Sequence, residues 1–153
     1  MEYTITWGGD PEDVCLATSG VAQLSDLDAL WREAVSDPGW RKEMKVLADH
    51  RSSDWTHFTV AEIEQRAARI KEMAAEIGPQ QIAFVARDSA SYQVGRLVAL
   101  LLDWQVPFQV RLFTSVEAAR EWLRLPTGSP PHVVPRPSRS AEASSNSPDE
   151  ATA

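Results

Sequence analysis

Between residues 44 and 113 the sequence alternates short apolar runs with longer amphipathic stretches. The runs at 44–48, 81–86 and 107–113 have the length and the apolar content of β-strands. The stretches between them repeat apolar side chains at helical spacing. A chain that alternates strand and helix in this way predicts a mostly parallel sheet, with right-handed crossovers and helices packed on the sheet.

Local signals place the ends of the expected helices. Thr59 and Glu62 have the spacing of a capping box, and Gly78 with the following proline is typical of a helix ending, so a helix is expected from about 59 to 77. Ser25 is the expected N-cap of an earlier helix, with Asp28 in its first turn.

Two further helices are expected near the end of the ordered part. The segment 114–117 has the pattern of a second capping box, ahead of a short helix at 115–123. A broadly apolar helix at about 89–103 contains Gly95, which weakens a helix relative to Ala, so we expect a close backbone approach at that position.

The two ends of the chain complete the expected architecture. Residues 2–7 alternate polar and apolar side chains, turn-forming residues follow, and 14–18 is a second strand, which indicates a β-hairpin. The order β-β-α-β-α-β-α-β-α predicts an α/β domain at 1–125, with a single mixed, mostly parallel five-stranded sheet covered by four helices. Six of the ten prolines fall in 126–153, where large apolar side chains are almost absent, so a disordered Pro/Ser-rich tail is expected there.

Composition excludes several classes of protein. The net charge of −7 disfavours nucleic acid and anionic membrane surfaces as partners, because both require Lys and Arg to meet phosphates. Cys15 is the only cysteine, which excludes an internal disulfide and a cysteine zinc cluster. No signal-peptide pattern begins the sequence and no apolar run approaches the roughly 20 residues of a membrane span. We therefore expect a cytoplasmic protein without membrane insertion and without a cofactor.

Most of the potential chemistry lies in segment 49–58, which is expected to be a polar loop after a buried strand. In an open α/β sheet, ligands bind beyond the carboxyl ends of the strands, and this edge would also hold 87–92 and 114–115. Helix N-termini and arginines there favour an anionic group, and aromatic side chains could form an apolar wall. The candidate binding residues are His50, Arg51, Trp55, His57, Arg87, Ser89, Tyr92 and Arg96. The alternative is that these side chains only cap helices, form turns and close the core.

A catalytic function is not expected. Asp49 and His50 are adjacent, so in a strand they would point to opposite faces rather than form part of a triad. The sequence has no Gly-x-Ser-x-Gly elbow, no histidine pair at metal-ligand spacing and no glycine-rich phosphate loop. A small hydrolase remains the third possibility.

Three segments resemble a known family. They are 37–41 ahead of the strand Val46-Leu47-Ala48-Asp49, the pattern Ser91-Tyr92-Gln93-Val94-Gly95-Arg96, and the ending from Phe113 to Leu123. Together with the order of elements, they are similar to the SpoIIAA-like proteins. These small bacterial proteins are related in fold to STAS domains and distantly to CRAL-TRIO lipid carriers.

The resemblance covers about residues 2–124. It implies a non-enzymatic regulatory module that binds an unidentified protein partner or a small amphipathic ligand. The alternative it leaves open is a carrier of a small hydrophobic acid or lipid. STAS antagonists are phosphorylated on Ser or Thr at the start of the helix after the third strand. This chain lacks the Asp-Ser-Ser-Gly-type turn of that site, and the acceptors in its place are Ser52, Ser53, Thr56 and Thr59.

Overall fold

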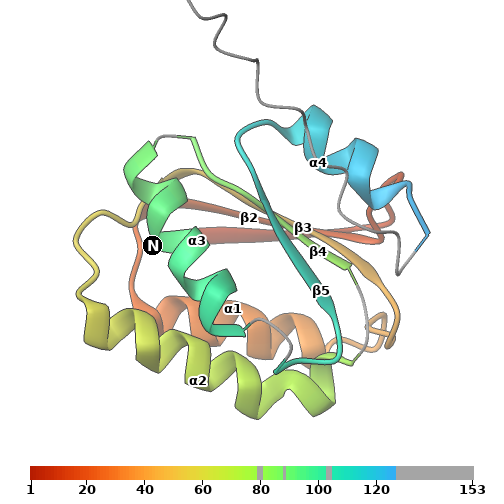
Figure 1. The fold of residues 1–153 in the computed structure, drawn as a ribbon. Helices are drawn as coiled ribbons and strands as arrows, with labels where there is room; N and C mark the ends of the chain where they lie inside the picture. The colour runs from red at the N-terminus through yellow and green to blue at the C-terminus, as the bar shows by residue number, and fades with distance from the viewer. Residues whose placement is uncertain (79–80, 88, 103–104, 127–153) are drawn as a thin grey trace, which may run out of the picture.

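The computed structural model describes residues 1–78, 81–87, 89–102 and 105–126. Five strands and four helices lie within these residues, in the predicted order (Figure 1). The strands are β1 (Glu2–Trp7), β2 (Val14–Val21), β3 (Lys45–Asp54), β4 (Gln81–Val85) and β5 (Gln109–Phe113). The helices are α1 (Leu24–Ser36), α2 (Val60–Ile77), α3 (Ser89–Leu102) and α4 (Val116–Leu123). The tail predicted at 126–153 lies, beyond Pro126, outside the described residues.

The strands form one sheet in the order β1-β2-β3-β4-β5. The hairpin strand β1 runs antiparallel to β2, and the other three pairs are parallel, as the alternating pattern predicted. Each parallel pair is joined through one helix, which is the βαβ connection expected for such a sheet.

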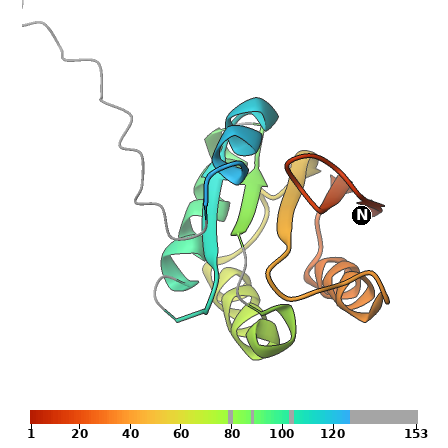
Figure 2. The same cartoon turned by 90° about the vertical axis from the view of Figure 1, so that its right-hand side faces the viewer.

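The helices divide between the two faces of the sheet. The larger core packs α1, α2 and α3 against one face, and a smaller core packs α4 against β3, β4 and β5 on the other. Figures 1 and 2 show α1 and α2 side by side at one end of the view and α4 at the opposite end. Half-buried Cys15 packs against the smaller core.

One predicted boundary is wrong, and it matters for the site. The polar loop expected at 49–58 is largely strand, because β3 continues to Asp54. Strand β2 is also longer than expected, and its last residues pair with Ser52, Ser53 and Asp54 after a register shift between Ala17 and Ser19. The neighbouring strand supplies backbone hydrogen bonds whatever the side chains are, so polar composition did not end the strand.

The predicted helix starts have mixed outcomes. The capping box at Thr59 and Glu62 is confirmed in both directions. For α1 the prediction is wrong, because the N-cap is Gln23, which makes no side-chain cap. Helix α4 is capped by Ser115, whose side chain accepts from the Ala118 backbone N–H, so the expected second capping box is a single cap.

Gly95 is where α3 comes close to β5, as its position in the helix predicted. A Cβ atom placed on it would lie 2.6 Å from Leu112 Cδ2. Glycine therefore allows the helix to sit against the strand, and the two residues line the same pocket.

Candidate functional site

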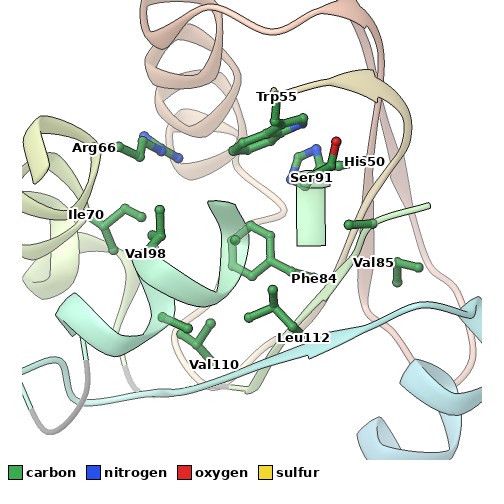
Figure 3. Close-up of a pocket in the computed structure, with 13 residues that line it drawn as sticks. His50, Trp55, Arg66, Ile70, Phe84, Val85, Ser91, Val98, Val110 and Leu112 are labelled. Atoms are coloured by element: carbon green, nitrogen blue, oxygen red, sulfur yellow. The ribbon is translucent and has the colours of Figure 1, made fainter. Parts of the chain in front are cut away.

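The candidate site is a pocket between the sheet, α2 and α3, which we call the α2–α3 pocket (Figure 3). His50 and Trp55 reach it from β3 and the turn that follows, and Arg66 reaches it from α2. Figure 3 shows these polar side chains at one end of the pocket and aliphatic ones at the other. The remaining lining residues are Ile70, Phe84, Val85, Ala86, Ser91, Gly95, Val98, Ala99, Val110 and Leu112.

His50 is buried, with 4% of its surface exposed. Its Nδ1 lies 2.7 Å from Thr18 Oγ1, which in turn lies 2.6 Å from Ser53 Oγ. If Thr18 donates to Nδ1, then Nε2 carries the ring proton. If Nδ1 donates to Thr18, then Nε2 is an acceptor. Within the described residues Nε2 has no hydrogen-bond partner, so this ring nitrogen is available for a ligand.

Burial and the positive charge of Arg66 lower the pKa of His50 from 6.5 to about 3, although Asp49 opposes the shift. The imidazole is therefore neutral at physiological pH. Phe84 stacks on it with ring centroids 5.5 Å apart, and Trp55 packs at 4.7 Å. The packing fixes the ring in the pocket wall.

Trp55 is also buried, and its indole ring lines the pocket. Its Nε1–H group finds no acceptor among the residues that the structure describes. Phe58 packs edge-on against the ring at 5.7 Å, and Ala22 and Leu27 belong to the same small cluster. A buried indole N–H usually finds a partner, so this donor is available to a ligand in the pocket.

Arg66 is the cation of the site. It is 4% exposed, and its Nη1 donates to Asp28 Oδ1 of α1 at 2.9 Å. Burial lowers the pKa of Arg66 to about 10 despite Asp28, so the guanidinium stays charged at neutral pH. Asp28 also forms an ion pair with a second guanidinium, that of Arg69, whose Nε is 3.7 Å from Asp28 Oδ2.

The α2–α3 pocket is narrow in this structure. The space open to the centre of a water molecule is about 30 Å³, and the whole depression, including its mouth, is about 480 Å³. A second small void of about 10 Å³ shares Ile70, Phe84 and Val110 with it and continues towards Trp31 and Phe108. Together they mark a line of loose packing along the α2 and α3 side of the sheet.

The eight candidate residues from the sequence are not all at one place. His50 and Trp55 lie together in the pocket wall. Arg51 points to the other face of the sheet, where its Nη2 pairs with Asp49 Oδ2 at 2.8 Å. Tyr92 is half-buried in α3 and is not among the residues that line the pocket. The side chains of His57, Arg87, Ser89 and Arg96 are exposed.

Three residues that line the pocket were not predicted from the sequence: Arg66, Phe84 and Ser91. An arginine at the spacing of the buried stripe of α2 was the available signal, because Ile63, Ala67 and Ile70 surround it on that face. Phe84 and Ile82 lie on the same face of β4, and an apolar side chain in a strand does not by itself indicate a pocket.

The site offers hydrogen-bond donors in an apolar setting, and the Thr18 hydroxyl that contacts His50 does not line the pocket, whereas Ser91 does. No cluster of three or more His, Cys, Asp or Glu side chains suited to a metal ion occurs in the part of the chain that is described. No helix there combines the length and the apolar character that crossing a bilayer requires.

Comparison with known proteins gives one likeness of fold. No family model and no curated protein matches the sequence. A solved structure from Shewanella loihica PV-4, described as an uncharacterized protein of the DUF3478 family with a SpoIIAA-like fold, superposes with a TM-score of 0.51. The match covers 80% of this chain and 92% of that one, at 14% sequence identity. The chain therefore has a SpoIIAA-like α/β fold, as the resemblance in its sequence implied.

Proposed function

We propose that the protein is a non-catalytic binding module, and that its ligand is a small molecule with an apolar body and one polar end. The observation that carries the proposal is the pairing of two buried, unpartnered side-chain nitrogens with a buried guanidinium in an otherwise apolar pocket. Ligand pockets commonly have this composition, with an apolar lining and a few convergent polar groups.

The arrangement is costly for a group of side chains that only fills a core. A buried polar group without a partner destabilises a fold by about 1–3 kcal/mol, and His50 Nε2 and Trp55 Nε1 are two such groups beside one cavity. A ligand that accepts hydrogen bonds from them would offset this cost. The polar and aliphatic ends of the pocket then match the two ends of an amphipathic molecule.

The pocket serves both expectations that the sequence left open, a regulatory module and a carrier. In each case the ligand enters between α2, α3 and the sheet. The narrow space implies that these helices move apart when it binds, because drug-sized ligands occupy about 300 Å³ or more. Such a movement would let a regulatory module signal that its site is occupied.

Native mass spectrometry of the freshly purified full chain, together with titration of the delipidated protein, tests the proposal. We expect a co-purified small molecule, or binding of decanoic acid or 1-decanol that shifts amide signals of α2 and α3 in NMR spectra. Ala99→Leu should weaken binding at least about tenfold, because the larger side chain fills the pocket. The matched control is Leu100→Ala at an exposed position of the same helix, which should leave affinity unchanged.

The proposal is wrong if the purified protein has the mass of the polypeptide alone and neither compound binds at millimolar concentration. It is also wrong if Leu100→Ala reduces binding as much as a correctly folded Ala99→Leu variant does.

A further inference from the structure

We infer that the polar end of the ligand is a carboxylate, and that Arg66 binds it in competition with Asp28. The inference rests on the proposed function. It specifies the chemical class of the ligand's polar end and the residue that binds it. The observations that support it are the donor content of the pocket, the buried guanidinium of Arg66 in its lining, and the geometry of the Asp28 contacts.

The polar atoms available at the pocket are donors or can become donors. Trp55 Nε1–H and the guanidinium of Arg66 are hydrogen-bond donors only. His50 Nε2 donates when Thr18 Oγ1 donates to Nδ1, an arrangement that the observed 2.7 Å contact allows. Ser53 then donates to Thr18 across their 2.6 Å contact, so Thr18 Oγ1 donates one hydrogen bond and accepts another. Such a set favours an acceptor-rich group and disfavours an amine.

A buried cation, Arg66, belongs to the lining of the pocket and can pair with an anionic group there. Asp28 contacts Arg66 at 2.9 Å and Arg69 at 3.7 Å, so one carboxylate faces two guanidinium groups. Glu72 also pairs with Arg69, at 3.0 Å, but both of those side chains are largely exposed to solvent. These four side chains carry no net charge, so an anion from the pocket side would share the guanidinium of Arg66 with Asp28 rather than meet an unpaired cation.

A carboxylate suits the site better than a larger anion. Its two oxygens match the planar fork of a guanidinium and accept two parallel hydrogen bonds. The space beside His50 and Trp55 is narrow, and a planar carboxylate needs less of it than a tetrahedral phosphate does.

Because Asp28 and the ligand would compete for Arg66, a change at Asp28 should alter ligand affinity. A purely structural role of Arg66 does not predict such an effect. Asp28 holds Arg66 from the α1 side, while the ligand would approach from the pocket side. Removing the charge of Asp28 frees Arg66 for the ligand, so Asp28→Asn should bind the acid more tightly than the wild type.

The test compares decanoic acid with 1-decanol, which differ only in the polar end, by calorimetric titration of the full chain at pH 7.5. We expect the wild type to bind the acid at least about tenfold more tightly than the alcohol, because a charge-assisted pair is stronger than a neutral hydrogen bond. Arg66→Met should abolish this preference and retain binding of the alcohol. Asp28→Asn should increase acid affinity severalfold and leave alcohol affinity unchanged.

Arg69→Met is the matched control, because Arg69 lies on the same helix and contacts the same carboxylate but is half exposed and does not line the pocket. It should keep the preference for the acid. If Arg66→Met fails to fold, Arg66→Lys and Asp28→Asn still decide the question, since Lys keeps the charge without the fork and should reduce the preference only in part.

The inference is overturned if the wild type binds the alcohol as tightly as the acid, or if folded Arg66→Met keeps the preference. It is also overturned if Asp28→Asn leaves acid affinity unchanged or lowers it. These outcomes leave the proposed function standing as long as either compound binds, whereas failure of both compounds to bind removes the proposed function itself.

Discussion

His50 shows how a single residue can be both explained by packing and available for function. One ring nitrogen contacts the Thr18 hydroxyl, Phe84 stacks on the ring, and Trp55 packs against it at a tilt. The other nitrogen is buried without a partner in the described structure. The sequence could identify His50 and Trp55 as candidates because both lie in the polar segment 49–58, although His50 proves to be part of β3. It could not show that Arg66 joins them, since that requires the packing of α2 on the sheet.

The buried state of His50 gives a pH dependence of stability that can be tested. Its pKa is about 3 in the folded protein against 6.5 for the free side chain, so between these values the unfolded chain binds a proton that the folded chain does not. Stability should therefore fall as pH falls from 6.5 towards 3, by up to about 1.4 kcal/mol per pH unit from this residue. Urea unfolding at pH 7, 6 and 5 measures the slope.

His50→Phe should show a smaller loss of stability between pH 7 and pH 5 than the wild type does. His57→Gln is the matched control, because His57 is exposed, and it should keep the wild-type slope. The burial of a neutral imidazole is contradicted if His50→Phe and the wild type lose stability equally over this range, or if NMR shows His50 titrating near 6.5.

At the scale of elements, features that depend on one segment could be predicted from the sequence. Features that depend on the packing of two segments could not. The capping box of α2 and the close approach at Gly95 depend on residue types at fixed spacings, and both are present. The extension of β3 to Asp54 depends on the equally long β2 beside it. Ser52, Ser53 and Asp54 have turn-forming side chains, so their composition alone favoured a loop.

Helix α4 is fixed to the other face of the sheet by two polar contacts at distant points of the chain. Arg120 donates to both carboxylate oxygens of Glu12, with Nη2 at 2.6 Å from Oε1. Lys45 Nζ donates to the backbone carbonyl of Leu123 near the end of the helix. Burial raises the pKa of Glu12, but the hydrogen bonds from Arg120, a backbone hydrogen bond and the charges of Arg120 and Arg124 together outweigh it and leave the pKa below its usual value.

Arg120→Met should destabilise the fold by about 2 kcal/mol, because it leaves a carboxylate that is 3% exposed without its cation. The figure lies below that for a fully buried pair because Arg120 itself is 42% exposed. The double variant Glu12→Met with Arg120→Met should recover part of the loss, since no buried charge remains. Urea unfolding at pH 7 measures all three proteins.

Arg41→Met is the control for this pair, because Arg41 forms a longer and largely exposed ion pair with Asp13 at 3.8 Å. Its effect should stay within about 0.5 kcal/mol. A double variant that is no more stable than Arg120→Met would show that the buried carboxylate is not the source of the cost.

At the scale of the whole molecule, the two faces of the sheet have different roles. The α4 face is covered by a small apolar core, with the ion pair between Arg120 and Glu12 at its edge. The opposite face holds the α2–α3 pocket and the adjoining void. The order of elements and the class of fold followed from hydrophobic periodicity, because each βαβ unit is a local pattern. The pocket did not, because it lies where three separate segments pack incompletely.

This difference predicts where binding alters the dynamics of the chain. Admission of decanoic acid to a space of about 30 Å³ requires α2 and α3 to separate from the sheet, and the bound acid then holds them closed. Hydrogen exchange followed by mass spectrometry should therefore slow more in segments 60–77 and 89–102 than in 116–123. Binding to the native state alone slows global unfolding and protects all helices equally, so the excess in α2 and α3 is the diagnostic part. Equal protection of α4, or protection confined to the β1–β2 hairpin, would place the ligand elsewhere on the fold.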